Sequence, residues 1–346
     1  MITTRITCVM PFYNEARHLP AVLASLETQT LPRERLYFIG VDNGSVDGSQ
    51  ALFEEWLARA GYDGRLLRAT VRSIPFALNT GLREVAGNDI VVRLDAHTVY
   101  ASDYLATIDE AFSTLPEDVW CVGGAPTPHL GATNYGRALG IALYSNPLGL
   151  GPADYRSAQT TSREVSTVYL GAWRPGVFAR LGLFDERWEA NEDCEFTERI
   201  RANGGRIFRI PVQSGRIVTR GPVGNIRQWA RYGFWRMQTF KQYPQAVRPR
   251  HVAAPVALLV ALGLALSRGR PLLAPLYALY ALMMVRCRRR GEPLAVTLGS
   301  LAFFPLVHIG YALGLIVGLL RTPGSLGADP STRARRRPPR ARAGEA

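Results

Sequence analysis

The first 250 residues predict an α/β domain built on a doubly wound, mainly parallel sheet. Short apolar runs alternate with longer amphipathic segments over residues 6–123, a pattern typical of parallel strands covered by helices on both faces. After residue 250 the chain becomes almost uncharged over three apolar stretches. We therefore expect an α/β domain at 1–250, hydrophobic membrane-associated helices at 251–321, and a disordered basic tail at 322–346.

Five strands and four helices are expected in the first 123 residues. Strands are short apolar runs, and helices are segments in which apolar residues recur every three or four positions. The expected strands are 6–10, 37–41, 66–69, 90–94 and 119–122. The expected helices are 18–27, 47–59, 77–84 and 102–115. The less regular middle predicts a loop at 123–131, a helix that begins near Glu192, short strands around Ile207 and Ile217, and an amphipathic helix at 225–243.

Three apolar stretches follow, at 252–267, 272–285 and 294–320. A helix needs about 20 apolar residues to cross a bilayer, with about 17 as the usual minimum, so only the third is comfortably long enough. The first two predict either tilted spans with snorkelling arginines or a hairpin lying partly in the interface. The arginines at 286–290 should face the cytoplasm, and the basic tail could touch anionic lipid. A soluble helical core is the weaker alternative, because the stretches lack an amphipathic stripe.

The composition narrows the class of partner. The formal net charge of +13 suits an anionic partner, whether nucleic acid, membrane lipid or phosphorylated substrate. Only Lys241 among the basic residues is a lysine, so part of the arginine excess reflects compositional bias. The arginines cluster late and lack the aromatic interleaving of RNA-binding segments, so nucleic acid is not an expected partner.

The cysteines and the first residues indicate the compartment. The four cysteines lie far apart without a Cys-x-x-Cys pair, which indicates a reducing environment and argues against a disulfide framework or a zinc knuckle. Residues 1–5 lead directly into a strand, without the charged and apolar segments of a signal peptide. We therefore expect the catalytic part to stay in the cytoplasm.

The stretch around Asp95 is the most informative motif. The apolar run 90–94 predicts a buried strand that ends in Asp95 and, two residues later, His97. Side chains at this spacing on an extended segment point the same way, so both could bind one metal ion or one phosphate-bearing ligand. The ends of strands in open α/β sheets are where ligands bind. The alternative is that Asp95 caps the next helix and His97 lies on the surface.

Two earlier strands also end in polar side chains. After the first strand, a base could stack on Tyr13 and hydrogen-bond to the neighbouring amide and carboxylate. After the second, Asp42 could accept a hydrogen bond from a uracil imide or a ribose hydroxyl, although Asp-Asn-Gly-Ser is equally well explained as a turn. The candidate binding residues of these two loops are Pro11, Tyr13, Asn14, Glu15, Asp42 and Asn43.

Further candidates follow on two helices. Asn79 lies on the helix that leads into the Asp95 strand. An acidic cluster at 189–195 begins another helix, where carboxylates complement the helix dipole, and this is the structural alternative. Phe196 and Ile200, four residues apart, should define the buried face of that helix. Asp193 could then project into the crevice as a general base, with Glu192 beside it as a second candidate catalytic residue.

The ordered set of motifs resembles glycosyltransferase family 2 with a GT-A fold. The resemblance covers roughly residues 5–245 and is carried by residues 7–15, 42–45, 79–81, 93–97, 171–174, 182–186 and 192–193. Asp-Ala-His at 95–97 and the hydrophobic C-terminal region most resemble succinoglycan-type exopolysaccharide glucosyltransferases of bacteria. The resemblance implies that Asp42 contacts uridine, that Asp95 and His97 meet the metal and diphosphate, and that Asp193 is the catalytic base.

Two positions refine these expectations. The family usually has Asp where this chain has His97, and imidazole, a softer ligand than carboxylate, favours Mn²⁺ over Mg²⁺. The other reading is that His97 contacts the diphosphate. Residues 228–232 are similar to the Gln-x-x-Arg-Trp motif of processive polysaccharide synthases, with Tyr in place of Trp. Gln228 and Arg231 share a helical face, and Arg231 could pair with the leaving diphosphate. An interfacial helix with arginines toward lipid headgroups is the alternative.

Together these patterns predict an inverting, metal-dependent transferase at the cytoplasmic face of the bacterial cytoplasmic membrane. The donor would be a nucleotide sugar, with UDP-sugar expected from the resemblance, and the acceptor a lipid-linked or other glycan. One base without a nucleophile motif predicts a single in-line displacement. Two alternatives remain: a processive polysaccharide synthase, which needs enough membrane spans to form a conduit, and a non-catalytic, membrane-anchored sugar-nucleotide-binding protein.

Overall fold

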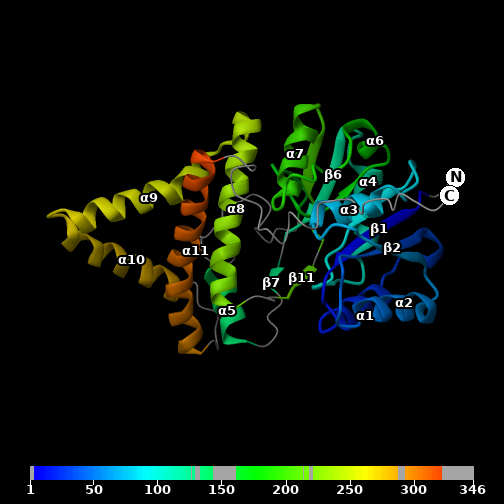
Figure 1. Ribbon diagram of the computed structural model, residues 1–346, viewed down its shortest axis with the longest axis horizontal. Helices are drawn as coiled ribbons and strands as arrows, with labels where there is room; N and C mark the ends of the chain where they lie inside the picture. The colour runs from blue at the N-terminus through cyan, green and yellow to red at the C-terminus, as the bar shows by residue number, and fades with distance from the viewer. Residues whose placement is uncertain are drawn as a thin grey trace, which may run out of the picture.

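The computed structural model describes residues 4–125, 127–128, 133–142, 161–212, 214–217, 221–286 and 293–321. Figure 1 shows an α/β body on one side and a group of long helices on the other. The expected tail at 322–346, the arginines at 288–290, and residues 126 and 129–131 of the expected loop lie outside the described residues.

An eight-stranded sheet forms the centre of the body, in the order β3-β2-β1-β4-β9-β6-β10-β8. β1 runs parallel to β2 and β4, with Met10 opposite Gly40 and Cys8 opposite Val92. The antiparallel strands are β9, between β4 and β6, and β8 at the edge. The mainly parallel α/β sheet is therefore confirmed. The strands are β1 (Ile6–Phe12), β2 (Leu36–Asp42), β3 (Asp63–Arg68), β4 (Ile90–Arg93), β6 (Val119–Gly124), β8 (Arg163–Glu164), β9 (Tyr169–Trp173) and β10 (Arg206–Arg209).

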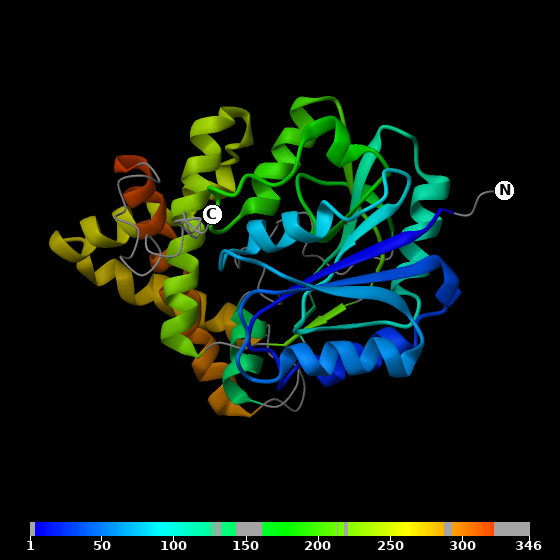
Figure 2. The ribbon, with the colours of Figure 1, turned by 45° about the vertical axis from the view of Figure 1, so that its right-hand side comes forward.

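Helices cover both faces of this sheet, as Figure 2 shows. One face carries α1 (Leu19–Glu27), α2 (Ser49–Ala60) and α4 (Tyr104–Thr114), and the other carries α3 (Ile74–Leu82), α6 (Val177–Leu181) and α7 (Glu192–Ala202). Alternate residues of β1 serve the two cores, because successive strand side chains point to opposite faces. Cys8 and Met10 pack with the first group of helices, whereas Val9 packs with the second.

The observed elements start and end close to the expected ones, with two instructive differences. α3 begins at Ile74 rather than at residue 77, and α8 (Pro222–Gln242) begins three residues earlier than expected. Each of these helices has a proline in its first turn, where the missing N–H needs no partner and the fixed φ favours the helix. The amphipathic pattern alone does not register this extra turn.

A small second sheet joins two distant parts of the chain. It has the order β5-β11-β7, formed by β5 (Thr98–Tyr100), β11 (Ser214–Arg216) and β7 (Thr127–Pro128). Thr98 pairs with Arg216, and the next residue, Ile217, donates its N–H to the His97 carbonyl at 2.9 Å. This pairing places Arg216 beside the loop of Asp95 and His97. Asp95 therefore leads into a strand, and the alternative in which it caps a helix is wrong.

The remaining helices pack beside the body. They are α5 (Asn134–Gly140), α8, α9 (Pro249–Leu266), α10 (Leu273–Arg286) and α11 (Leu294–Leu320). α11 lies against α8 through Gly310, Gly314 and Gly318 (Figure 1). A Cβ atom at Gly314 would clash with the carbonyl oxygen of Ala230. Glycine at every fourth position thus allows the two backbones to touch.

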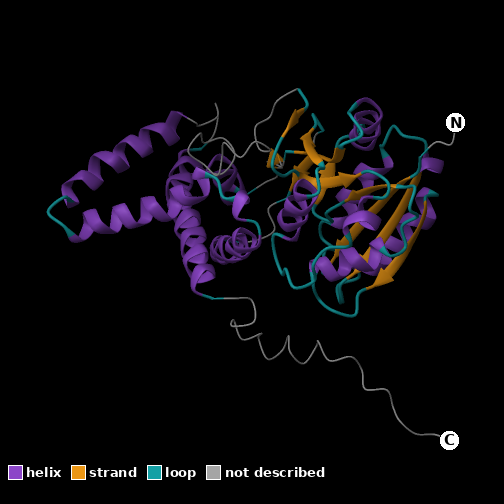
Figure 3. Ribbon diagram, turned by 90° about the horizontal axis from the view of Figure 1, so that it is seen from above, coloured by secondary structure: helices purple, strands orange, loops and turns teal. Residues whose placement is uncertain are grey.

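α9 and α10 form a hairpin that extends away from the body, as Figure 3 shows from above. The Tyr280 hydroxyl of α10 donates to the Leu301 carbonyl of α11 at 3.1 Å. Leu301 needs such a donor because its helical partner, Pro305, has no N–H. Within the described part of the chain, α11 alone is long and apolar enough to cross a membrane, judged by length and composition. The uninterrupted apolar part of α9 is shorter, Pro255–Leu266.

Candidate functional site

A cavity of about 1190 Å³ lies between the carboxyl ends of β1 and β4 and the helices α7, α8, α9 and α11. Typical small-molecule sites occupy roughly 300–1,000 Å³, so this cavity has room for more than one substrate. Nine of the residues predicted to be catalytic or to bind the nucleotide sugar line it: Pro11, Tyr13, Glu15, Asn43, Asp95, Glu192, Asp193, Gln228 and Arg231. His97 lines it as well. The ends of β1, β2 and β4 and the first turn of α7 were expected to lie close together, and the structure places all of them around this cavity.

Asp95 and His97 lie on the turn that connects β4 to β5. Tyr100 holds this turn, because its hydroxyl accepts the Asp95 N–H at 2.7 Å and lies 3.2 Å from the Asp95 carbonyl. His97 Nδ1 is 3.3 Å from Glu15 Oε1. Its Nε2 is buried and has no hydrogen-bond partner among the described residues. The imidazole is thus oriented by Glu15 on one side and leaves one nitrogen for a ligand.

Two carboxyls in this region are poised to stay ionised. Burial raises the pKa of Asp95, but the positive charges of Arg93, His97 and Arg216 outweigh it and hold the pKa below its usual value. Burial likewise raises the pKa of Glu15, and its hydrogen bonds and charge interactions with His97 and His18 bring the pKa below normal. Asp95 therefore offers a negatively charged ligand at neutral pH.

Arg93 connects the strand end to the mouth of α7. Its Nη1 is 2.8 Å from Glu192 Oε1, and its Nε is 3.5 Å from Asp95 Oδ1. Burial raises the pKa of Glu192, Arg93 lowers it, and the neighbouring Asp193 raises it, so that the pKa lies above its usual value. The buried cation holds two acidic side chains from different elements at one place.

The mouth of α7 presents Asp193 to the cavity. Asn191 precedes the helix in a left-handed conformation (φ 59°), and its side chain donates to the Tyr232 carbonyl of α8 at 2.8 Å. Phe196 and Ile200 are fully buried, which confirms the expected inner face of α7. Asp193 accepts the Cys194 N–H at 2.7 Å and lines the cavity. Its place one turn before the buried face explains this orientation.

Three predicted binding residues do not reach the cavity wall. Asn14 accepts the Val46 N–H at 2.9 Å, and Asp42 accepts the Ser45 N–H at 2.9 Å and the Gln50 amide at 2.6 Å. These contacts hold the turn, as the turn reading of the sequence allowed. Asn79 is 2% exposed and exchanges two hydrogen bonds with the Phe184 backbone, at 2.9 and 3.0 Å. Its amide is fully used in joining α3 to the loop before α7.

Tyr13 has one face occupied already. The Arg72 guanidinium lies over its ring, 3.5 Å from the centroid, a favourable cation–π distance. Tyr13 also lines the cavity together with Asn43. A base that stacks on Tyr13 would therefore use the opposite face.

Gln228 and Arg231 lie on α8 and line the cavity. Gln228 donates to the Tyr232 hydroxyl at 2.6 Å, and Arg231 donates to the Glu189 carbonyl at 2.7 Å. The expected shared helical face is thus turned toward the α7 mouth. Arg231 links the acidic cluster to α8.

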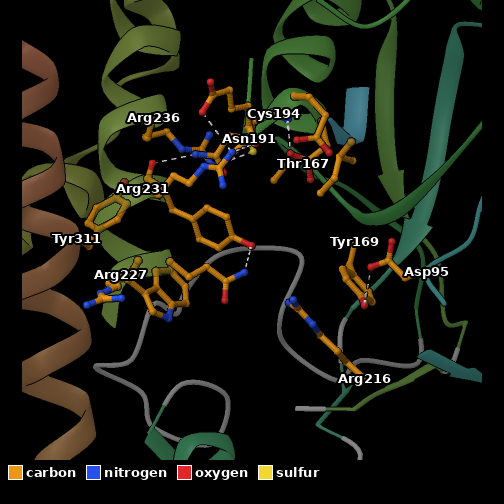
Figure 4. A pocket seen from close by; sticks show the side chains of 18 of the residues that line it. Asp95, Thr167, Tyr169, Asn191, Cys194, Arg216, Arg227, Arg231, Arg236 and Tyr311 are labelled. Carbon is orange, nitrogen blue, oxygen red and sulfur yellow. Dashed lines mark hydrogen bonds and ion pairs between the residues drawn. The ribbon is translucent and has the colours of Figure 1, made fainter. Parts of the chain in front are cut away.

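Several cavity residues have no signal in the sequence. Figure 4 shows Asp95 and Tyr169 on one side, Arg216 near them, and Arg227 and Arg236 on the α8 side. The Tyr169 hydroxyl lies 3.5 Å from Asp95 Oδ2. Tyr169 and Arg216 reach the site only through β9 and β11, which pair with partners far along the chain. Non-local pairing of this kind is not readable from short motifs.

Residues 7–143 of the chain match the family model described as Glycosyl transferase family 2, and they include β2, β3, β4 and β6 of the central sheet and all but the first residue of β1. Among curated proteins, the succinoglycan biosynthesis protein ExoA of Rhizobium meliloti (strain 1021) is 28% identical over 210 residues, 60% of this chain and 61% of ExoA. The matched region thus spans less than two thirds of that relative.

Two solved structures share the fold. The mannosyltransferase PcManGT from Pyrobaculum calidifontis, in complex with GDP-Man and Mn²⁺, gives a TM-score of 0.59 at 21% identity and covers 89% of this chain and 86% of its own. TarS 1-349 of S. aureus, in complex with UDP, gives 0.50 at 14% identity and covers 90% of this chain and 92% of its own. The expected GT-A fold is confirmed.

Proposed function

We propose that this protein is a membrane-associated glycosyltransferase of exopolysaccharide or cell-surface glycan synthesis. It transfers a sugar from a nucleotide sugar to a lipid-linked or saccharide acceptor, with inversion at the anomeric carbon. The observation that carries the proposal is the common cavity of Asp95, His97 and Asp193, which come from two separate elements. The match to family 2 and the likeness to ExoA support it.

The nucleotide would bind at the ends of β1 and β2. Pro11, Tyr13 and Asn43 line this end of the cavity. The ring of Tyr13 offers a stacking surface for a base, and the Asn43 amide offers hydrogen bonds. Neighbours of this fold were solved with GDP-Man and with UDP, so the fold accommodates both kinds of nucleotide. A UDP-sugar is the donor that the family resemblance favours.

A divalent metal fits the residues at the end of β4. Among the residues that the structure describes, no three His, Cys, Asp or Glu side chains form a complete metal site. Two ligands are nevertheless available, the ionised Asp95 carboxylate and the unpartnered Nε2 of His97. Sites of this kind take further ligands from the substrate phosphates and from water. A bound metal would neutralise charge that develops on the departing diphosphate, and the imidazole ligand favours Mn²⁺.

Asp193 is the proposed general base. It would accept the proton of the acceptor hydroxyl as the hydroxyl oxygen forms a bond to the anomeric carbon and the bond to the diphosphate breaks. Arg231 and Arg216 line the same cavity and would stabilise the negative charge on the leaving group. Glu192, held by Arg93, would fix the mouth of α7 and so position Asp193.

The proposed location is the cytoplasmic face of the membrane. α11 has the length and composition of a membrane-spanning helix. The hairpin of α9 and α10 exposes apolar side chains such as Leu259, Leu266 and Leu279, which suit a bilayer interface better than water.

The test is a comparison of Asp193→Asn with Asp103→Asn, an exposed aspartate before α4. Asp193→Asn should reduce sugar transfer by a factor of about 10²–10⁴, the usual contribution of a general base. Binding of UDP and Mn²⁺ should stay near the wild-type value. Asp103→Asn should leave both unchanged. Retained transfer in Asp193→Asn would refute the assigned base.

A further inference from the structure

We propose that the part of the cavity between α8, α9 and α11 binds the acceptor as an anionic amphiphile. Its phosphate-bearing headgroup would lie among the arginines of α8, and its hydrocarbon chain would lie between α9 and α11. This inference rests on the proposed glycosyl transfer and specifies which acceptor the same cavity receives.

The first argument is the chemical contrast between the two ends of the cavity. The end at the strands is lined by polar and charged side chains such as Glu15, Asp95 and Asp193. The far end is lined mainly by apolar ones, Ala257, Leu258 and Ala261 of α9 and Phe304, Pro305 and Ile309 of α11, together with His251, His308 and Tyr311. A nucleotide sugar has no group that gains from such a wall, whereas a hydrocarbon chain does.

The second argument is the charge between the two ends. Arg227, Arg231 and Arg236 of α8 line the cavity between the acidic α7 mouth and the apolar wall (Figure 4). Arg231 is 3.4 Å from the Glu189 carboxylate, and Arg236 contacts Cys194 Sγ at 2.8 Å. Arg227 is exposed and has no acceptor within hydrogen-bond distance among the described residues. A phosphate group bound here would meet guanidinium donors suited to its geometry.

The third argument is access. α9 has a second side that faces away from the cavity, where Leu259, Val260, Leu262 and Leu266 are each more than half exposed. A helix that is apolar on all sides in this way is stable in lipid rather than in water. A chain lying between α9 and α11 therefore passes from the bilayer to the cavity without crossing water. This continuity selects a membrane-derived acceptor over a soluble saccharide.

The test measures binding of farnesyl diphosphate to the full chain in lipid nanodiscs. Farnesyl diphosphate carries both chemical parts, and inorganic diphosphate and farnesol each carry one. We expect farnesyl diphosphate to bind at least tenfold more tightly than either of the others. Ala261→Trp, which fills the apolar end, should weaken its binding at least tenfold. Ala265→Trp is the matched control, because Ala265 lies one turn further along α9 and does not line the cavity.

The same preparations separate this inference from the proposed function. Binding of UDP with Mn²⁺, and hydrolysis of UDP-glucose, UDP-galactose or GDP-mannose, report on the donor end. Arg227→Gln should weaken the binding of farnesyl diphosphate several-fold. Two results would overturn the proposed acceptor-binding site: equal affinity of Ala261→Trp and Ala265→Trp for farnesyl diphosphate, or equal affinity of the wild type for inorganic diphosphate and farnesyl diphosphate. If the wild type binds farnesyl diphosphate selectively but does not hydrolyse any of the donors, the proposed glycosyltransferase function is overturned instead.

Discussion

Replacing Arg93 with methionine removes the cation that lies between Glu192 and Asp95, at 2.8 and 3.5 Å. The three side chains are 13%, 6% and 13% exposed, so water screens their interaction poorly. Removing one partner of a buried ion pair costs about 3–5 kcal/mol, because the remaining charge stays buried without compensation. We expect the free energy of unfolding of Arg93→Met to fall by about this amount at pH 7.

The loss should depend on pH with a definite sign. In the wild-type protein the pKa of Asp95 is lowered, so its ionised form contributes stability that is lost as the pH falls through the folded-state pKa. In Arg93→Met, the positive charge that offsets the effect of burial on Asp95 is removed, so the pKa of Asp95 rises. The pKa of Glu192, already raised, rises further. Protonation of Asp95 and Glu192 at lower pH then removes their uncompensated buried charges in the variant. The difference in unfolding free energy between the wild type and Arg93→Met should therefore become smaller from neutral pH toward acid.

The assay is urea unfolding of the full chain in nanodiscs, followed by tryptophan fluorescence across pH. Arg83→Met is the matched control, because Arg83 is 53% exposed and pairs with Glu186 at 3.2 Å. An exposed pair contributes about 0–1 kcal/mol, so this variant should remain close to the wild type. Equal losses in the two variants, or a difference that widens toward acid, would contradict the reasoning.

Three further outcomes are expected. Asn79→Ala should lower the free energy of unfolding by about 1–3 kcal/mol, because it leaves the Phe184 backbone unsatisfied; nucleotide affinity, measured by titration with UDP, should not change. His97→Ala should weaken Mn²⁺ binding, and EDTA should abolish donor hydrolysis that Mn²⁺ then restores; hydrolysis unaffected by EDTA would exclude the metal. Gly314→Leu should separate α11 from α8, because even a Cβ would clash with Ala230, and limited proteolysis should then cleave between the two helices faster than in Gly263→Leu, where the added side chain meets open space.

The sheet and the loops that line the cavity were predictable from the sequence because they depend on local signals. An apolar run followed by Asp95 and His97 indicates both a buried strand and the point where that strand ends. The four-residue spacing of Phe196 and Ile200 indicates the buried face of α7, and so the side of the helix on which Asp193 lies. These residues line one cavity in the structure. The spacing of apolar residues and the positions of the polar ones in the sequence, without any knowledge of contacts, were enough to predict that Asp95, His97 and Asp193 share one cavity.

Other features depend on contacts that a pattern does not contain. Asp42 and Asn79 are polar residues at the expected edge of the sheet, yet turn N–H groups and a neighbouring loop take up their hydrogen bonds. Arg216 is unremarkable in sequence and reaches the site only because β11 pairs with β5. A polar side chain near a sheet edge can serve the backbone or the ligand, and the pairing of distant segments decides which.

The backbone contact between α8 and α11 has a mechanical consequence. Gln228 and Arg231 lie on the same helix that packs on Gly310, Gly314 and Gly318, where backbone atoms of Ile226, Ala230 and Phe234 come close to the three glycines. A hydrophobic helix tilts to match the thickness of the lipid around it. When α11 tilts, α8 must follow, and Gln228 and Arg231, the second of which is proposed to meet the diphosphate, move with it. Sugar transfer would then respond to the hydrocarbon thickness of the host membrane, even where donor, acceptor and metal are all in excess.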